Sequence, residues 1–100
     1  MIDPDTIIRL RNILYRRQAG RCWNCGKPMD WSIMQCAHRI PQRKHWLARY
    51  GERIIHHPDN FRGTCPTDRC NNAASIGNNL HQAEKIAEAI ETTIAKEGFT

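Results

Sequence analysis

Apolar residues near the start of the chain recur every three or four positions, which predicts a helix over residues 4–18. Ile7, Leu10 and Leu14 fall on one stripe of this helix, and Ile13 lies at its flank. Gly20 follows the periodic stretch, and glycine commonly ends a helix because it adopts a left-handed backbone without strain. We therefore expect the first helix to end just before Gly20.

A second periodic stretch runs from about residue 79 to residue 96 and predicts a long amphipathic helix. Its apolar positions alternate between spacings of three and four: Leu80, Ala83, Ala87, Ile90 and Ile94. Two heptads are too few to indicate a coiled coil. We expect this stripe to pack on the N-terminal helix of the same chain, and a homodimer formed through the C-terminal helix is the alternative.

The middle of the chain predicts short elements rather than long ones. Residues 31–38 have the composition of a strand, with apolar side chains at Trp31, Ile33, Met34 and Cys36. Residues 39–59 are basic, and the prolines within them exclude a long helix. Inside this region we expect a short helix over residues 45–50, ended by Gly51, and a short strand over residues 52–56.

Length and charge narrow the class of protein. One hundred residues form one domain, residues 1–100, and a domain this small often needs a metal or a cross-link for stability. The net charge of +5 and a pI near 9.2 favour an anionic partner. No apolar run is long enough to span a membrane. The chain opens with Asp3 and Asp5 and lacks the apolar stretch of a signal peptide.

Four of the five cysteines form two close pairs, which predicts a structural zinc site. Two residues separate Cys22 from Cys25, and four separate Cys65 from Cys70, so the spacings are those of zinc ligands. Residues 21–29 would form the tight turn around the first pair, with Gly26 at positive φ. Disulfides are the alternative, and the missing secretion signal disfavours them. The remaining cysteine, Cys36, is expected to be a small buried strand residue.

Within and beside the cysteine pairs the chain resembles the HNH endonucleases, which have a ββα-metal core. The resemblance covers about residues 22–75 and rests on the cysteine pairs together with Ala37-His38-Arg39-Ile40-Pro41, Pro58-Asp59-Asn60-Phe61 and Cys70-Asn71-Asn72. It implies an α+β fold, in which a zinc-stabilised ββα-metal core is flanked by N- and C-terminal helices. Because Asn71 stands where the family commonly has histidine, the chain is an HNN-like variant.

The resemblance also implies an activity, the metal-dependent hydrolysis of DNA phosphodiester bonds. Neutral His38 would take a proton from the attacking water, since the ordinary pKa of histidine lies near working pH. Asn60 would hold the loop that follows His38. Asn71 would offer an oxygen to a hard divalent ion such as Mg²⁺ or Mn²⁺. His38, Asn60 and Asn71 are therefore the candidate catalytic residues.

Two positions depart from the family pattern. Ala37 stands where many members carry an acid or a histidine as a metal ligand, and Ala74 stands where a lysine or histidine is common. His57 is the candidate replacement ligand, with His56 and Asp59 as alternatives. These departures keep two other functions open. One is a zinc-clamped DNA-binding module without catalytic activity, and the other is a zinc-stabilised protein-interaction domain.

The positive charges gather next to the candidate site. They lie after His38 and at the end of the first helix: Arg39, Arg43, Lys44, Arg16 and Arg17. Arginine and lysine neutralise backbone phosphates without reading sequence, so these residues are the predicted DNA contacts. The resemblance is to proteins typical of bacteria and their phages, which implies a location in the cytoplasm of a bacterium or a phage-infected host cell.

Overall fold

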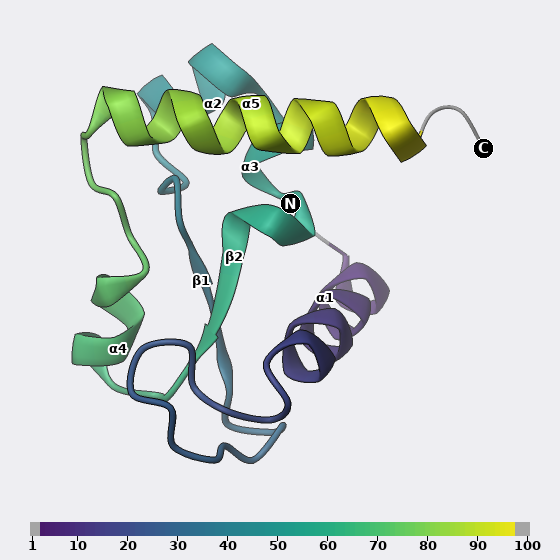
Figure 1. Ribbon diagram of the computed structural model, residues 1–100, viewed down its shortest axis with the longest axis vertical. Helices are drawn as coiled ribbons and strands as arrows, with labels where there is room; N and C mark the ends of the chain where they lie inside the picture. Colours follow the sequence, from purple (N-terminus) through teal and green to yellow (C-terminus); the bar gives the residue numbers. More distant parts are fainter. Residues whose placement is uncertain (1–2, 98–100) are drawn as a thin grey trace.

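The computed structural model describes residues 3–97 and shows an α+β arrangement of a two-stranded sheet with five α-helices (Figure 1). In chain order the elements are α1 (Pro4–Arg17), β1 (Gln35–His38), α2 (Lys44–Tyr50), α3 (Glu52–Ile55), the 3₁₀ helix η1 (Pro58–Asn60), β2 (Phe61–Thr64), α4 (Asp68–Ala73) and α5 (Leu80–Glu97). The predicted α+β class is confirmed. No helix within residues 3–97 is both long and apolar enough to cross a membrane.

Helix α1 confirms the first predicted helix and has the expected ends. Asp3 caps it by accepting a hydrogen bond from the backbone N–H of Thr6 at 2.9 Å. After Arg17 the chain turns through two residues with positive φ, the second of which is Gly20 at 72°. The apolar stripe is narrower than predicted: Leu10 and Leu14 are buried, whereas Ile7 is 40% exposed.

The two strands form an antiparallel pair that is shorter than the predicted strand over residues 31–38. His38 lies opposite Phe61, and Gln35 lies opposite Thr64. Residues 31–33 form a turn, in which the Asp30 carboxylate accepts a hydrogen bond from the backbone N–H of Ser32 at 2.9 Å. Aspartate stabilises a turn in this way, and the apolar residues beside it did not override that local preference.

The short helix at residues 45–50 is confirmed, but the strand predicted over residues 52–56 is wrong. Gly51, at φ 79°, ends α2 and redirects the chain into α3. Ile54 and Ile55 are both buried in the core. Neighbouring residues of a strand point to opposite faces, so a strand would have sent one of these isoleucines outward. A helical turn lets both face the core.

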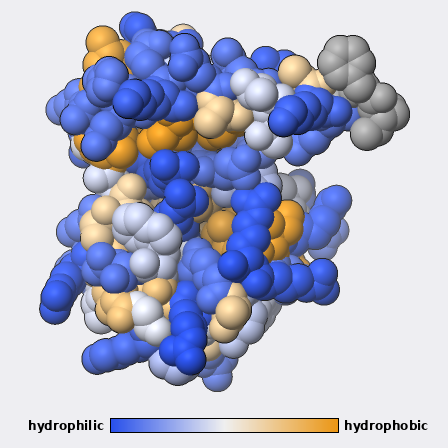
Figure 2. Space-filling model, viewed as in Figure 1, coloured by the Kyte–Doolittle hydropathy of each residue, from blue (hydrophilic) through white to orange (hydrophobic). Residues whose placement is uncertain are grey.

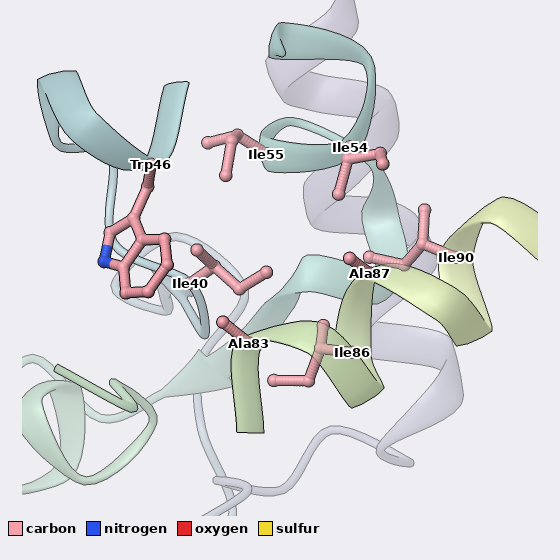
Figure 3. Close-up of a cluster of buried hydrophobic side chains, with 8 residues drawn as sticks. All are labelled: Ile40, Trp46, Ile54, Ile55, Ala83, Ile86, Ala87 and Ile90. Atoms are coloured by element: carbon pink, nitrogen blue, oxygen red, sulfur yellow. The ribbon is translucent and has the colours of Figure 1, made fainter. Parts of the chain in front are cut away.

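Helix α5 packs on α3, α2 and the segment after β1 rather than on α1 (Figure 3). The cluster drawn there contains Ile40, Trp46, Ile54 and Ile55, together with Ala83, Ile86, Ala87 and Ile90 of α5. The buried residues of α1 belong to a separate cluster with Cys22, Met29, Met34, Phe61 and Cys70. The predicted α1–α5 packing is therefore wrong, because the α3 isoleucines supply the apolar surface that α5 covers.

Most of the apolar stripe of α5 is thus buried within the chain, through Ala83, Ala87 and Ile90. In Figure 2 the outer surface of this helix is hydrophilic, and apolar side chains appear along its lower edge, where it meets the rest of the molecule. Leu80, at the start of the predicted stripe, is 48% exposed. The homodimer through α5 stays a prediction.

Candidate metal centre and histidine site

The two cysteine pairs come together in space. The Sγ atoms of Cys22, Cys25, Cys65 and Cys70 all lie within 4.8 Å of one another. Tetrahedral zinc with Zn–S bonds of about 2.3 Å separates its sulfur ligands by roughly 3.8 Å, so the cluster fits a metal ion such as zinc. All five cysteines are free thiols. Cys36 lies outside the cluster, half-buried in β1, where burial raises the pKa of its thiol.

Backbone and side-chain N–H groups orient the sulfur atoms. Gly26 turns the chain at φ 74° and donates its N–H to the carbonyl of Cys22 at 2.9 Å, which closes the turn around the first pair. The backbone N–H of Cys65 points at the Sγ of Cys22 at 3.3 Å, and the Asn24 amide at the Sγ of Cys70 at 3.6 Å. Such donors stabilise thiolates, which are the form that binds metals.

The cysteine pKa values show how strongly the sulfurs of the cluster act on one another. Burial raises the pKa of Cys22, but the backbone N–H groups of Cys25, Cys65 and Asn24 outweigh it and leave the pKa at about 6. Hydrogen bonding to the Cys25 sulfur, together with burial and the Cys22 sulfur, raises the pKa of Cys65 to about 12. Neighbouring thiolates repel each other, and the charge of a bound divalent ion offsets this repulsion.

His38 lies at the end of β1, next to a second histidine. Its Nε2 is 3.4 Å from Nδ1 of His56, and its ring packs on Phe61 with centroids 4.2 Å apart. Burial, followed by the neighbouring His56, lowers the pKa of His38 from 6.5 to about 4. The ring is therefore neutral at pH 7 and can accept a proton there, although its basicity is reduced.

We expect His38 to remain neutral at pH 5. Its ring-proton NMR shift, followed from pH 7.5 downward, should titrate near pH 4. The unfolded chain takes up this proton near pH 6.5, so the contribution to stability is complete above that pH and is lost as the pH falls toward 4. Replacing the neighbour, His56→Gln, should raise the pKa of His38. A midpoint near 6.5 in the wild-type protein would contradict the half-buried position of the His38 ring.

Asn60 is fully buried and fastens the loop that follows His38. Its Oδ1 accepts the backbone N–H of Ile40 at 2.9 Å. Its Nδ2 donates to the carbonyls of Ile40 at 3.1 Å and Ile55 at 2.8 Å. These three bonds join the loop after β1 to the end of α3. This geometry is the holding arrangement that the sequence predicts for Asn60, and its part in catalysis stays a prediction.

Asn71 lies in α4 and contacts the other side of the hairpin. Its Nδ2 donates to Oε1 of Gln35 at 2.6 Å. Side chains alternate along a strand, so Gln35 and Ala37 face α4 while His38 faces the side of Phe61 and α1. Figure 1 shows α1 and α4 on opposite sides of the hairpin. The structure therefore does not bring His38 and Asn71 together, which sequence order could not reveal.

The surroundings of Asn71 do not fit a divalent ion. Ala37 and Ala74 are buried and offer no ligand atom. Arg62, opposite Ala37 in β2, places a guanidinium on this face instead. Within residues 3–97 the four cysteines are the only group of three or more histidine, cysteine or acidic side chains placed to share an ion. A Mg²⁺ or Mn²⁺ site at Asn71 therefore lacks the expected ligands.

His57, the candidate replacement ligand, does not contact His38. Its Nδ1 accepts the backbone N–H of Asp59 at 3.1 Å, which caps η1, and its Nε2 lies 3.7 Å from Glu97. His56 is the histidine that the structure places beside His38. The sequence pattern favoured His57 and left His56 as an alternative, because two adjacent histidines in a loop carry no signal of which one faces inward.

The predicted DNA contacts separate into two groups. Arg16 and Arg17 lie at the end of α1, where Arg17 also pairs with Asp59 at 2.6 Å. Arg43 and Lys44 lie at the start of α2, and Arg43 donates to Asn78 at 3.0 Å. Arg39 lies between the groups, after β1.

Comparison of the chain with family models, with curated proteins and with solved structures found no match.

Proposed function

We propose that the chain is a zinc-stabilised DNA endonuclease of the HNH type. The observation that carries this proposal is the fully buried Asn60, whose three hydrogen bonds fasten the loop that follows a neutral His38. That pairing matches the residue roles which the resemblance implies. Zinc in the cysteine cluster would hold the turn around the first pair to β2 and α4, and so fix the hairpin that carries His38.

In this proposal His38 supplies the proton-accepting nitrogen. Its ring is neutral at pH 7, and a base placed at the attacking water contributes about 10²–10⁴-fold to hydrolysis. His56, whose Nδ1 lies 3.4 Å from Nε2 of His38, would help to orient the His38 ring. Basic residues such as Arg16 and Lys44 would neutralise the DNA phosphates. Dependence on Mg²⁺ or Mn²⁺ remains part of the proposal, with an ion that the DNA phosphates would have to help hold, because the protein ligands expected at Asn71 are missing.

Relaxation of supercoiled plasmid tests this function directly. Protein loaded with zinc is incubated with Mg²⁺, with Mn²⁺ and with neither ion. We expect nicking that needs an added ion, since a base alone leaves the phosphate charge and the leaving oxygen unstabilised. If cleavage occurs without any added ion, the arginines are sufficient to stabilise the phosphate charge and the leaving oxygen. If no condition yields nicked plasmid, the endonuclease proposal fails.

A DNA-binding module without hydrolysis is the second candidate. The placement of His38 and Asn71 on opposite faces of the hairpin favours it, because the resemblance implies an active site in which both residues reach one phosphate. Such a module would still bind DNA through phosphates. We expect the affinity to fall with salt at a slope near −0.9 per phosphate, which gives roughly −4 to −7 for four to eight contacts. Absent or salt-independent binding, measured by fluorescence anisotropy, would favour the protein-interaction domain.

A further inference from the structure

A groove opens between the end of α4, the start of α5 and the residue that follows β1. Its volume is about 340 Å³, roughly ten times the share of one water molecule, so a phosphate with attached groups has room there. Among the described residues 3–97, no carboxylate lines it. Its lining includes Trp23, Arg39, Ser75, Ile76 and Lys85.

The cations of this groove have few partners. Lys85 is exposed and makes no ion pair or hydrogen bond within the described residues 3–97. Arg39 donates one N–H to the backbone carbonyl of Asp59 at 3.1 Å. Two cations on a groove without a carboxylate favour an anionic ligand.

Arg62 adds a third positive charge behind the groove. Its guanidinium carbon lies 5.7 Å from the centre of the Trp23 ring, and its buried Nε has no hydrogen-bond partner. Burial, followed by the charge of Arg39, lowers the pKa of Arg62. The Asp59 carboxylate offsets part of the repulsion between the two arginines, and an anion in the groove would offset more of it.

Trp23 supplies a flat aromatic surface on the same groove. It belongs to the turn that carries the first cysteine pair, and its side chain is 45% exposed. An exposed indole beside cations is the combination with which proteins hold single-stranded nucleic acid, since bases stack on the ring while the phosphates meet the charges.

We infer that this groove binds one nucleotide unit of a nucleic-acid strand, with the phosphate at Arg39 and Lys85 and an unstacked base on Trp23. The inference rests on the proposed function for its ligand class, and it states where the strand is held. It also places cationic side chains, rather than a divalent ion, near the face of the hairpin that carries Ala37.

Two exposed residues of the groove allow a test that spares the fold. The variants are Lys85→Gln and Trp23→Leu, and the control is Lys96→Gln, an exposed lysine near the far end of the same helix. Binding of a short single-stranded oligothymidylate is measured across salt concentrations. Amide NMR shifts are recorded with inorganic pyrophosphate, with thymidine monophosphate and with the oligonucleotide.

We expect Lys85→Gln to weaken oligonucleotide binding and to reduce the salt slope by about 1, while Lys96→Gln leaves both unchanged. Trp23→Leu should weaken binding by roughly 5- to 150-fold, as loss of one stacked base does. Pyrophosphate should shift the amides of Ser75 and Ile76 in the wild type and much less in Lys85→Gln. The mononucleotide should bind more weakly than the oligonucleotide.

Three results would overturn the inference. If the oligonucleotide binds but both variants match the wild type, the groove is not its site, although the proposed function survives. If pyrophosphate binds but Trp23→Leu has no effect on the oligonucleotide, the base is not held on the indole. If the wild type binds neither pyrophosphate nor the oligonucleotide but still cleaves duplex plasmid, the groove inference is wrong and the proposed function stands. If the wild type also fails to cleave plasmid, both proposals are wrong.

Discussion

Cys22→Ser is expected to unfold the domain. Zinc contributes about 10–16 kcal/mol in small cysteine sites, whereas a whole domain is stable by only about 5–15 kcal/mol. Cys22 is also buried with Leu14 and Phe61, so its loss disturbs the cluster that holds α1 against β2. Circular dichroism should show the loss of cooperative melting, and metal analysis should find less than the one zinc per chain expected of the wild type.

The fifth cysteine provides a matched control. Cys36→Ser removes a half-buried thiol that lies outside the cluster, so this variant should keep its zinc and melt cooperatively. The metal-centre interpretation would be wrong if purified wild-type protein held no zinc and still melted in one sharp transition. It would also be wrong if Cys22→Ser and Cys36→Ser had equal stability.

His38→Ala should lose plasmid cleavage by about 10²–10⁴-fold, the usual contribution of a general base. The fold should survive, because the histidine contacts Phe61 and His56 at the end of a short strand and the hydrogen bonds of Asn60 remain. Nicked plasmid is quantified over time, and zinc content and DNA affinity are measured in parallel. Both should match the wild type.

His81→Ala is the control for this experiment, since His81 is exposed in the first turn of α5 and does not belong to β1. It should cleave like the wild type. Equal cleavage by His38→Ala and the wild type would assign the activity to other residues or to a contaminant. In that case the DNA-binding module becomes the better account, and the opposite placement of His38 and Asn71 on the hairpin explains why.

Much of the framework follows from local sequence. The apolar periods predicted α1 and α5, and Gly51 predicted the end of α2 because it reaches positive φ without strain. The metal cluster was also predictable, since the spacing within each cysteine pair already positions two sulfurs for one ion. Asn60 was identified through the motif that surrounds it, and its buried hydrogen bonds match that expectation.

Other features depend on contacts between distant segments. Two adjacent isoleucines, Ile54 and Ile55, have no period that distinguishes helix from strand, so only the packing of α5 against them decided in favour of α3. The pairing of His38 with His56, rather than with His57, depends on how α3 turns. The groove that joins Trp23, Arg39 and Lys85 draws on three segments whose side chains carry no common motif.

The sequence by itself determined the zinc-type cysteine framework, the helices at both ends and the basic charge, because each depends on spacing or composition within a short stretch. Tertiary structure alone decided which face of the hairpin each candidate residue occupies. Successive side chains of β1 point to opposite sides of the hairpin, so His38 lies on one face and Gln35, which Asn71 contacts, lies on the other. His38 and Asn71 are therefore apart, although the resemblance places both in one motif.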